Sequence, residues 1–197
     1  MGPVICDRCR AALRDCRQVA RAGSLPLFAL GAHDAELRRA IHAIKFRNRA
    51  AAAEALGELL GERLIAAGEF CTDVVVPVPL HPSRLRERGY NQSELIARGI
   101  LTSLSRTRGS DPGVALEPSA VVRARATQPQ TELGFAQRQK NVAGAFAAGP
   151  RAGSVLRRRV VLVDDVVTTS ATMVACAKVL RTCGAAAVTA AALALRV

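Results

Sequence analysis

Apolar residues follow two spacings along the chain, and the change from one to the other marks the predicted elements. After Asp34, apolar residues recur at the spacing of a helix, at Leu37, Ile41 and Ile44. Asp34 itself is a suitable N-cap for that helix. A second helical stretch covers residues 50–67, so the part of the chain from 34 to 67 is predicted to be helical and to lead into the sheet.

The middle of the chain predicts a buried strand followed by polar connections. Residues 73–80, DVVVPVPL, form a continuous apolar run, which is typical of a strand covered on both faces. Asn91 fits the first position of a capping box for the next helix. Residues 105–118 are turn-rich and predict a surface connection, with a short strand at 120–122. A basic, Gln-rich segment then predicts a mobile loop that leads into a short helix over 133–140.

The end of the chain shows the clearest pattern, a strand, a loop, a helix and a second strand. The strands are predicted at 160–163 and 188–195, and the loop covers 164–169. Gly184 ends the helix. Its apolar face consists of Met173, Cys176, Ala177 and Leu180. This βαβ unit predicts an α/β fold with a parallel sheet between helices, and ligands at the carboxyl ends of its strands.

The segment VVLVDDVVTTSAT carries the candidate chemistry, because two carboxylates and a hydroxyl-rich turn follow a buried strand. Backbone amides over residues 168–172, at the positive end of a helix, suit a phosphate dianion. Asp164 and Asp165 would repel a bare phosphate, so they predict sugar hydroxyls as their partner. A ribose 5-phosphate meets both demands. Helix capping alone explains single Ser, Thr or Asp residues here, but two Asp and four hydroxyl residues in nine positions favour a binding site.

No GxxxxGK[ST] or GxGxxG sequence is present, so common nucleotide cradles are not supported. VVLVDDVVTTSAT resembles the signature of type I phosphoribosyltransferases, which bind phosphoribosyl pyrophosphate (PRPP). Three further segments resemble the ComF family, competence-associated proteins that carry this domain. They are IHAIKFRNR, VVPVPLHPSRLRERGYNQSELIAR and TQPQTELGFAQRQKNVAGAF, so the resemblance extends from about His33 to the C-terminus.

The resemblance implies a role for each matching position. Asp164 and Asp165 would face the ribose hydroxyls and the water shell of a bound Mg²⁺. The 5-phosphate would be held by Thr168, Thr169, Ser170, Ala171 and Thr172. The pyrophosphate would be bound by the loop at Leu80, His81 and Arg84, with Arg88 as a further candidate. At position 170 the family usually has Gly, so Ser170 is less comfortable there if the backbone needs a positive φ.

Other basic and polar residues have both a binding and a structural interpretation. The candidates for a loop that folds over the site are Arg123, Gln130, Arg138 and Asn141. A solvated loop explains them equally well. Lys45 matches a family motif, yet a basic residue at a helix end needs no ligand to explain it.

The chain is predicted to have two parts, a Cys-containing segment at 1–24 and the phosphoribosyltransferase-like domain at 25–197. Three of the six cysteines lie in the first part. Cys6, Cys9 and Cys16 provide three thiolates, whereas a closed zinc site needs four ligands. The resemblance implies a zinc ribbon, so the segment either holds Zn²⁺ with a fourth ligand such as His33 or carries free thiols. The remaining cysteines are predicted to be small core residues: Cys71, Cys176 and Cys183.

Composition limits the partners and the compartment. The 197 residues suit one α/β domain, and 28 Lys and Arg against 16 Asp and Glu give a net charge of +12. Such a surplus attracts polyanions, but a charge that only aids solubility, or a general bias towards Arg, explains it equally well. The most apolar stretch is too short to span a membrane, and the first residues lack the apolar core of a secretory signal. We therefore expect a cytoplasmic protein.

Two functions from different classes agree with these residues. The first is Mg²⁺-dependent transfer of a phosphoribosyl group from PRPP to an acceptor that the sequence does not identify. The second is a non-catalytic module that binds DNA or protein partners in DNA uptake, as the ComF resemblance implies. Aromatic residues make up only 3% of the chain, so DNA would be held mainly through its phosphates. A regulator that senses PRPP without consuming it is a third reading.

Overall fold

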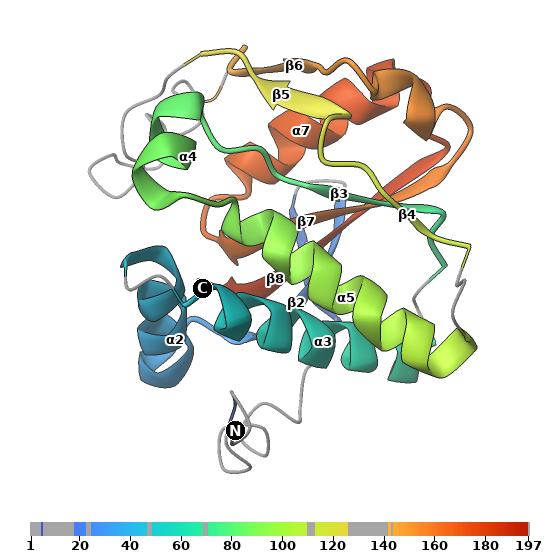
Figure 1. Ribbon diagram of the computed structural model, residues 1–197. Coiled ribbons are helices and arrows are strands. Elements are labelled where there is room, and N and C mark those ends of the chain that lie inside the picture. Colours follow the sequence, from blue (N-terminus) through green and yellow to red (C-terminus); the bar gives the residue numbers. More distant parts are fainter. Residues whose placement is uncertain are drawn as a thin grey trace.

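The computed structural model describes residue 5 and residues 18–22, 25–46, 49–68, 71–109, 113–125, 142 and 144–196. These residues form an α/β fold around a six-stranded sheet with the order β1-β2-β8-β7-β3-β4 (Figure 1). Helices cover both faces of that sheet. The fold class predicted from the sequence is therefore confirmed.

The strands of the main sheet are β1 (Gln18–Ala22), β2 (Leu25–Ala32), β3 (Val74–Pro77), β4 (Ala115–Leu116), β7 (Arg159–Val167) and β8 (Ala187–Leu195). From β2 to β4 all neighbours are parallel, whereas β1 pairs with β2 in the antiparallel direction. β7 and β8 lie at the centre and are joined through α7 (Ala171–Thr182), which confirms the βαβ unit. The strands read as apolar runs because both of their faces are buried.

One face of the sheet is covered by α2 (Ala35–Phe46), α3 (Ala50–Ala66) and α5 (Gln92–Arg108). Asp34 caps α2, since its Oδ1 accepts from the backbone N–H groups of Glu36 and Leu37. Glycines on α3 and α5 let the two backbones approach closely. A Cβ at Gly99 would lie 2.0 Å from the carbonyl oxygen of Glu54, and one at Gly57 would lie 2.2 Å from that of Ile96.

The other face is covered by α7 and by a small antiparallel sheet of β5 (Val121–Arg123) and β6 (Phe146–Ala148). The 3₁₀-helix η2 (Ala152–Val155) connects this small sheet to β7. Met173, Cys176 and Leu180 of α7 are fully buried in the core on this face of the main sheet, as their spacing predicted. Among the described residues, no helix is long and apolar enough to cross a membrane.

Three sequence-based boundaries differ from the structure. β7 continues to Val167, so Asp164 and Asp165 lie within the strand and not in a loop, and Asp164 pairs with Ala192 of β8. Residues 105–118 are not only a connection, because α5 extends to Arg108 and β4 adds an edge strand. The basic segment after β3 contains a short helix, α4 (Pro82–Arg88). The predicted helix at 133–140 lies outside the described residues.

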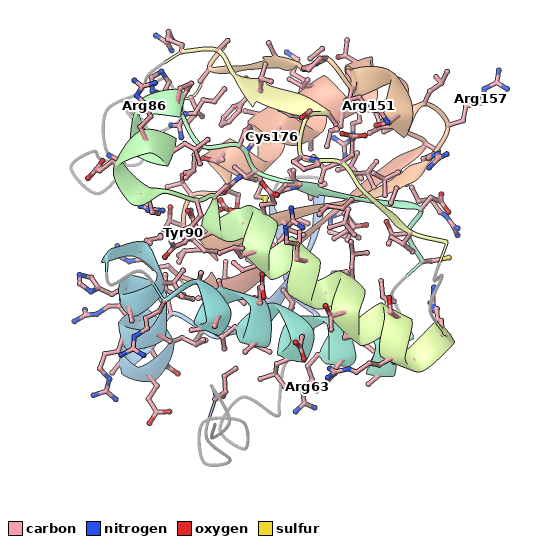
Figure 2. All side chains as sticks on the ribbon, viewed as in Figure 1. Arg63, Arg86, Tyr90, Arg151, Arg157 and Cys176 are labelled. Carbon is pink, nitrogen blue, oxygen red and sulfur yellow. The ribbon has the colours of Figure 1, made fainter. Side chains whose placement is uncertain are left out.

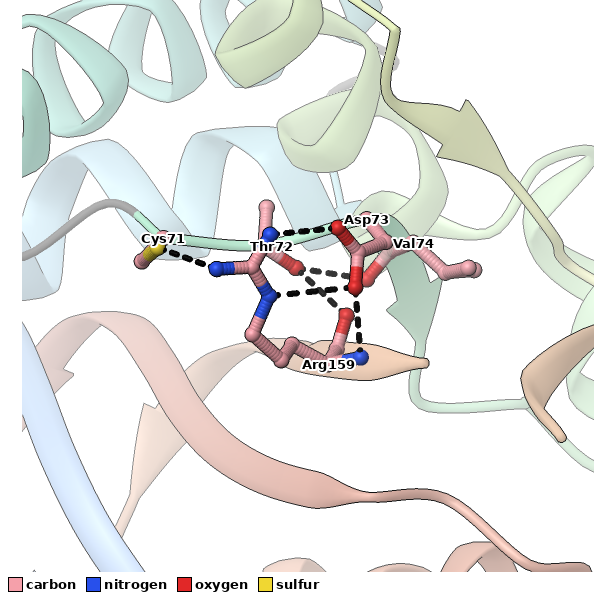
Figure 3. A network of polar contacts seen from close by, with 5 residues as sticks. All are labelled: Cys71, Thr72, Asp73, Val74 and Arg159. Carbon is pink, nitrogen blue, oxygen red and sulfur yellow. Dashed lines mark hydrogen bonds and ion pairs between the residues drawn. The ribbon is translucent and has the colours of Figure 1, made fainter. Parts of the chain in front are cut away.

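Cys71 was predicted to be buried, and the structure shows that it is exposed. It lies before β3, where the Arg159 guanidinium contacts its sulfur and also binds both carboxylate oxygens of Asp73 (Figure 3). The Asp73 Oδ1 to Arg159 Nη2 distance is 2.6 Å, and this contact holds the pKa of Asp73 at about 2. The network joins the starts of β3 and β7. Cys176 is buried and Cys183 is partly buried, closer to the prediction.

Candidate functional site

Asp164 lies near the carboxyl end of β7, next to the first turn of α5. Its Oδ1 accepts a hydrogen bond from the Ser93 hydroxyl at 2.9 Å and from the backbone N–H of Asp165 at 2.8 Å. Ser93 is positioned by Asn91, whose Oδ1 accepts from the Ser93 N–H and whose Nδ2 donates to the carbonyl of Val78 after β3. The site therefore joins the ends of β3, β7 and the start of α5.

Asp165, one residue further along β7, makes a different contact. Its Oδ2 lies 2.8 Å from Nζ of Lys45, at the end of α2. The Asp165 side chain is 6% exposed and that of Lys45 is 25% exposed, so this ion pair is largely shielded from water. Successive side chains of a strand point in opposite directions, which explains why adjacent carboxylates meet different elements.

The electrostatics of Asp164 follow from this arrangement. Burial, and then the negative charge of Asp165, raise the pKa of Asp164 to about 7. The backbone N–H of Asp165, the Lys45 ammonium and the Ser93 hydroxyl act in the opposite direction. The carboxyl group can therefore gain or lose a proton near neutral pH, which is unusual for an aspartate.

The turn between β7 and α7 forms a polar cradle. Ser170 is the N-cap residue of α7 with φ 60° and ψ −2°, a left-handed conformation, and its side chain does not cap the helix. The Thr169 hydroxyl oxygen is buried, and no described residue provides a hydrogen-bond partner for it. The first turn of a 12-residue helix and a buried, unsatisfied hydroxyl thus lie together. Both features favour an anion at this turn.

The predicted pyrophosphate loop lies at the end of the neighbouring strand, β3. Leu80 is in the connection after that strand, and His81 is the N-cap of α4, where Nδ1 accepts from the Ser83 N–H at 3.3 Å. Arg84 lies in α4, and the Arg88 guanidinium donates to Oε1 of Gln92. The structure thus gives His81 a capping role at the start of α4.

Arg123 was predicted in a mobile loop, and the structure places it on β5 instead. Its guanidinium carbon lies 5.5 Å from the centroid of the Phe146 ring on β6, a cation–π contact. Burial lowers the pKa of Arg123, and the charges of Asp164 and Arg84 act on it as well. The remaining candidates from this segment lie outside the described residues: Gln130, Arg138 and Asn141. The possible zinc ligands Cys6, Cys9 and Cys16 also lie outside the described residues.

Two contributors were missed by sequence reasoning. Ser93 was part of a capping pattern, and nothing in the pattern indicated that its hydroxyl reaches Asp164, 71 positions away. Tyr90 donates its hydroxyl to the carbonyl of Ile44 and so ties the start of α5 to the end of α2 beside Lys45. A lone Tyr in a chain with few aromatics was the only available signal.

A bound Mg²⁺ would find a limited set of protein ligands here. Among the described residues, no group of three or more His, Cys, Asp or Glu can hold a metal ion. Asp164 and Asp165 provide two carboxylates, one of them already paired with Lys45. Mg²⁺ commonly binds through one or two carboxylates, waters and the phosphates of a substrate. The residues therefore fit a metal ion that binds together with a phosphorylated ligand.

Comparison with known proteins agrees with this geometry. A family model described as "Phosphoribosyl transferase domain" matches residues 92–196, from the start of α5 through β8. That match covers Ser93, both carboxylates and the α7 turn. The chain belongs to the phosphoribosyl transferase domain family, and its relatives confirm the resemblance to ComF proteins.

Those relatives have names that refer to DNA utilization or to competence. "DNA utilization protein YhgH" of Escherichia coli (strain K12) is 37% identical over 152 residues, 75% of this chain and 62% of that protein. The protein of the same name from Salmonella typhimurium is 34% identical over the same shares. "Competence protein F" of Haemophilus influenzae is 32% identical over 57% of this chain and 45% of its own length. The chain thus spans 62% of the length of the YhgH proteins it matches.

Proposed function

We propose that the end of β7 and the first turn of α7 bind PRPP or another ribose 5-phosphate ligand. The carrying observation is the α7 turn, where left-handed Ser170 leaves the helix start without a side-chain cap and Thr169 buries an unsatisfied hydroxyl. A phosphate dianion there would receive hydrogen bonds from the amides of residues 168–172 and from the hydroxyls of Thr168 and Thr169. Membership of the phosphoribosyl transferase domain family supports this role.

The carboxylates beside that turn suit the sugar. The described contacts of Asp164 use Oδ1, which leaves Oδ2 to accept from a ribose hydroxyl. Asp165 is oriented by Lys45, which also offsets part of the negative charge beside the phosphate. Hydroxyl donors satisfy carboxylates without bringing further negative charge, so a ribose 5-phosphate fits both halves of the site.

The proposed reaction is transfer of the phosphoribosyl group from PRPP to an acceptor. The bond between C1 of the ribose and the pyrophosphate oxygen breaks, pyrophosphate leaves with the electron pair, and the acceptor forms the new bond to C1. Positive charge develops on the ribose ring meanwhile, and the carboxylate of Asp164 would stabilise it. Mg²⁺, when bound with the ligand, would neutralise the leaving pyrophosphate. Arg84 and the start of α4 would orient that pyrophosphate.

The sugar half of the site can be tested without an acceptor. Calorimetric titration should show that ribose 5-phosphate binds about tenfold more tightly than 2-deoxyribose 5-phosphate, because a hydroxyl bound to a carboxylate is lost. In the Asp164→Asn, Asp165→Asn double variant the two sugars should bind alike. Equal affinities in the parent protein would remove the carboxylates from sugar recognition.

Transfer itself is tested by pyrophosphate release from PRPP in the presence of Mg²⁺ and a panel of nucleobases and other nitrogen or oxygen acceptors. Release that depends on one acceptor and disappears in the double variant supports the enzyme. PRPP that binds and is never consumed would favour a regulator that senses PRPP.

A DNA-binding module is the second candidate function. The names of the relatives, "DNA utilization protein" and "Competence protein F", and the net charge of +12 favour it. Binding through phosphates would weaken steeply as salt concentration rises. An affinity for DNA that is absent or independent of salt would count against this candidate.

A further inference from the structure

Basic residues concentrate on the two helices that flank the end of β7. α2 has the sequence AELRRAIHAIKF, with three Arg or Lys residues against one Glu. α4 has the sequence PSRLRER, again with three Arg against one Glu. We use the term site-end surface for the basic residues around that end of the sheet. They are Arg38, Arg39 and His42 on α2, Arg84, Arg86 and Arg88 on α4, and Arg196 after β8.

Contacts join these elements into one surface. Lys45 of α2 forms an ion pair with Asp165 of β7. Tyr90, which follows the Gly89 C-cap of α4, donates its hydroxyl to the carbonyl of Ile44 on α2. Arg196 donates its backbone N–H to the carbonyl of Val167, at the end of β7. Burial, and then the positive charges of Arg196, Lys45 and Arg38, lower the pKa of His33, while the charge of Asp165 acts in the opposite direction.

This positive surface continues beyond the site. Arg38, His42 and Lys45 follow the spacing i, i+4, i+7, so they share one face of α2. Seven residues of helix correspond to about 10 Å along the axis, so Arg38 lies about that far along α2 from Lys45, which contacts Asp165. Arg38 and Arg39 are both exposed. A ligand with repeated phosphates can use such a row, whereas one phosphoribosyl ligand occupies only its end.

The opposite end of the sheet is basic as well, but its charges are partly neutralised. Arg159 is bound by Asp73, and Arg151 lies 3.2 Å from Glu117. Arg157 and Arg158 are exposed there. Figure 2 shows Arg86 and Arg157 on opposite sides of the molecule. Arg157 and Arg158 therefore provide a matched control for any effect of charge alone.

We propose that the site-end surface binds the phosphate backbone of a nucleic acid. This inference assigns a surface to the second candidate function, and it holds whether or not the neighbouring site transfers a phosphoribosyl group. A membrane fits less well, because Leu85 is the only large hydrophobic residue exposed in the described parts of α2 and α4. With one Tyr and no Trp in the chain, base stacking is scarce, so single strands and duplexes should bind alike.

The test is fluorescence anisotropy of a short labelled DNA duplex, titrated with protein at several salt concentrations. Arg38→Gln with Arg39→Gln should weaken binding about tenfold and lower the slope of log affinity against log salt by about two. Arg86→Gln should weaken binding in the same direction. Arg157→Gln with Arg158→Gln removes the same charge at the opposite end and should change affinity little.

Three results would overturn the inference: no binding by the parent protein, an equal loss in the control variant, or binding to anionic lipid vesicles and not to DNA. PRPP titration of the Arg38→Gln, Arg39→Gln variant separates this inference from the proposed function. If DNA binding fails while PRPP still binds, only the nucleic-acid role of the site-end surface is refuted. If the parent protein does not bind PRPP but still binds DNA, only the proposed phosphoribosyl site is refuted.

Discussion

Ser170 has the backbone conformation that glycine adopts most easily. At φ 60°, a residue with a Cβ is strained by roughly 1 kcal/mol relative to Gly. Ser170→Gly should therefore relieve about 1 kcal/mol of strain, of which the added freedom of the unfolded chain offsets a part, so denaturant unfolding should show no loss of stability. It should also tighten PRPP binding, because the α7 turn can approach the phosphate more closely.

Arg157 is the matched control for that prediction, since its φ is 57° and it lies far from the α7 turn. Arg157→Gly should likewise show no loss of stability and leave PRPP affinity unchanged. If Ser170→Gly weakens PRPP binding, the hydroxyl of Ser170 is itself a phosphate ligand. The claim that this turn needs backbone freedom would then be wrong.

Asp164 predicts a specific dependence of stability on pH. Its pKa is about 7 in the folded protein and about 3.9 in an unfolded chain, so the folded state holds the proton more tightly. The stability contributed by the protonated form is present below about pH 4 and is lost as pH rises through 7. Urea unfolding should therefore show Asp164→Asn gaining stability relative to the parent across that window.

Asp73 should show the opposite trend and serves as the control. Arg159 lowers the pKa of Asp73 to about 2, so its contribution is present above about pH 4 and is lost as pH falls through 2. Asp73→Asn should thus lose stability relative to the parent as pH rises from about 2 to 4. A flat difference for Asp164→Asn between pH 4 and 7 would show that its carboxyl is not shifted.

Some site residues could be identified from the sequence and others could not. The DD pair and the TTS turn could be identified because they are contiguous in the chain. Ser93 could not, because its contact with Asp164 depends on how α5 packs against β7. Strand pairing with β8 also carries β7 past the two aspartates, although the sequence there resembles a loop.

At the scale of elements, the glycines between α3 and α5 set the distance between these helices. Gly99→Ala would place a Cβ 2.0 Å from the carbonyl oxygen of Glu54, so the helices must separate. We expect a loss of about 3 kcal/mol in unfolding free energy, at the upper part of the range for overpacking.

Gly153→Ala is the control for this packing, because a Cβ there meets no atom within 4 Å. Its stability should stay close to that of the parent. Because α5 also carries Ser93, Gly99→Ala should weaken ligand binding as well as stability. A Gly99→Ala protein as stable as the parent would mean that the helices do not pack as described.

Most elements follow from local sequence pattern, and the exceptions have physical reasons. α2, α5 and α7 have apolar residues at helical spacing, and β7 and β8 are apolar runs; the structure confirms each of them, and α3 as well. α4 was missed because seven residues with one Leu give no apolar face to detect. β4 was missed because two residues carry too little pattern, and its place at the sheet edge is decided by pairing with β3.

At the scale of the whole molecule, charge and topology act at the same end of the sheet. The parallel strands bring Asp164, the α7 turn and the α4 connection together at their carboxyl ends, as this fold class predicts. The basic residues of α2 and α4 surround that end. Net charge alone indicated an anionic partner, and only the fold shows where the positive charges gather.

The central claim is that the end of β7 and the α7 turn hold a phosphoribosyl ligand. Calorimetric titration of the purified protein with PRPP, with and without Mg²⁺, tests it most directly. We predict saturable binding that Mg²⁺ strengthens and that becomes at least about tenfold weaker in the Asp164→Asn, Asp165→Asn variant, which should remain folded. No heat of binding by the parent protein, or binding unchanged in the folded double variant, would contradict it.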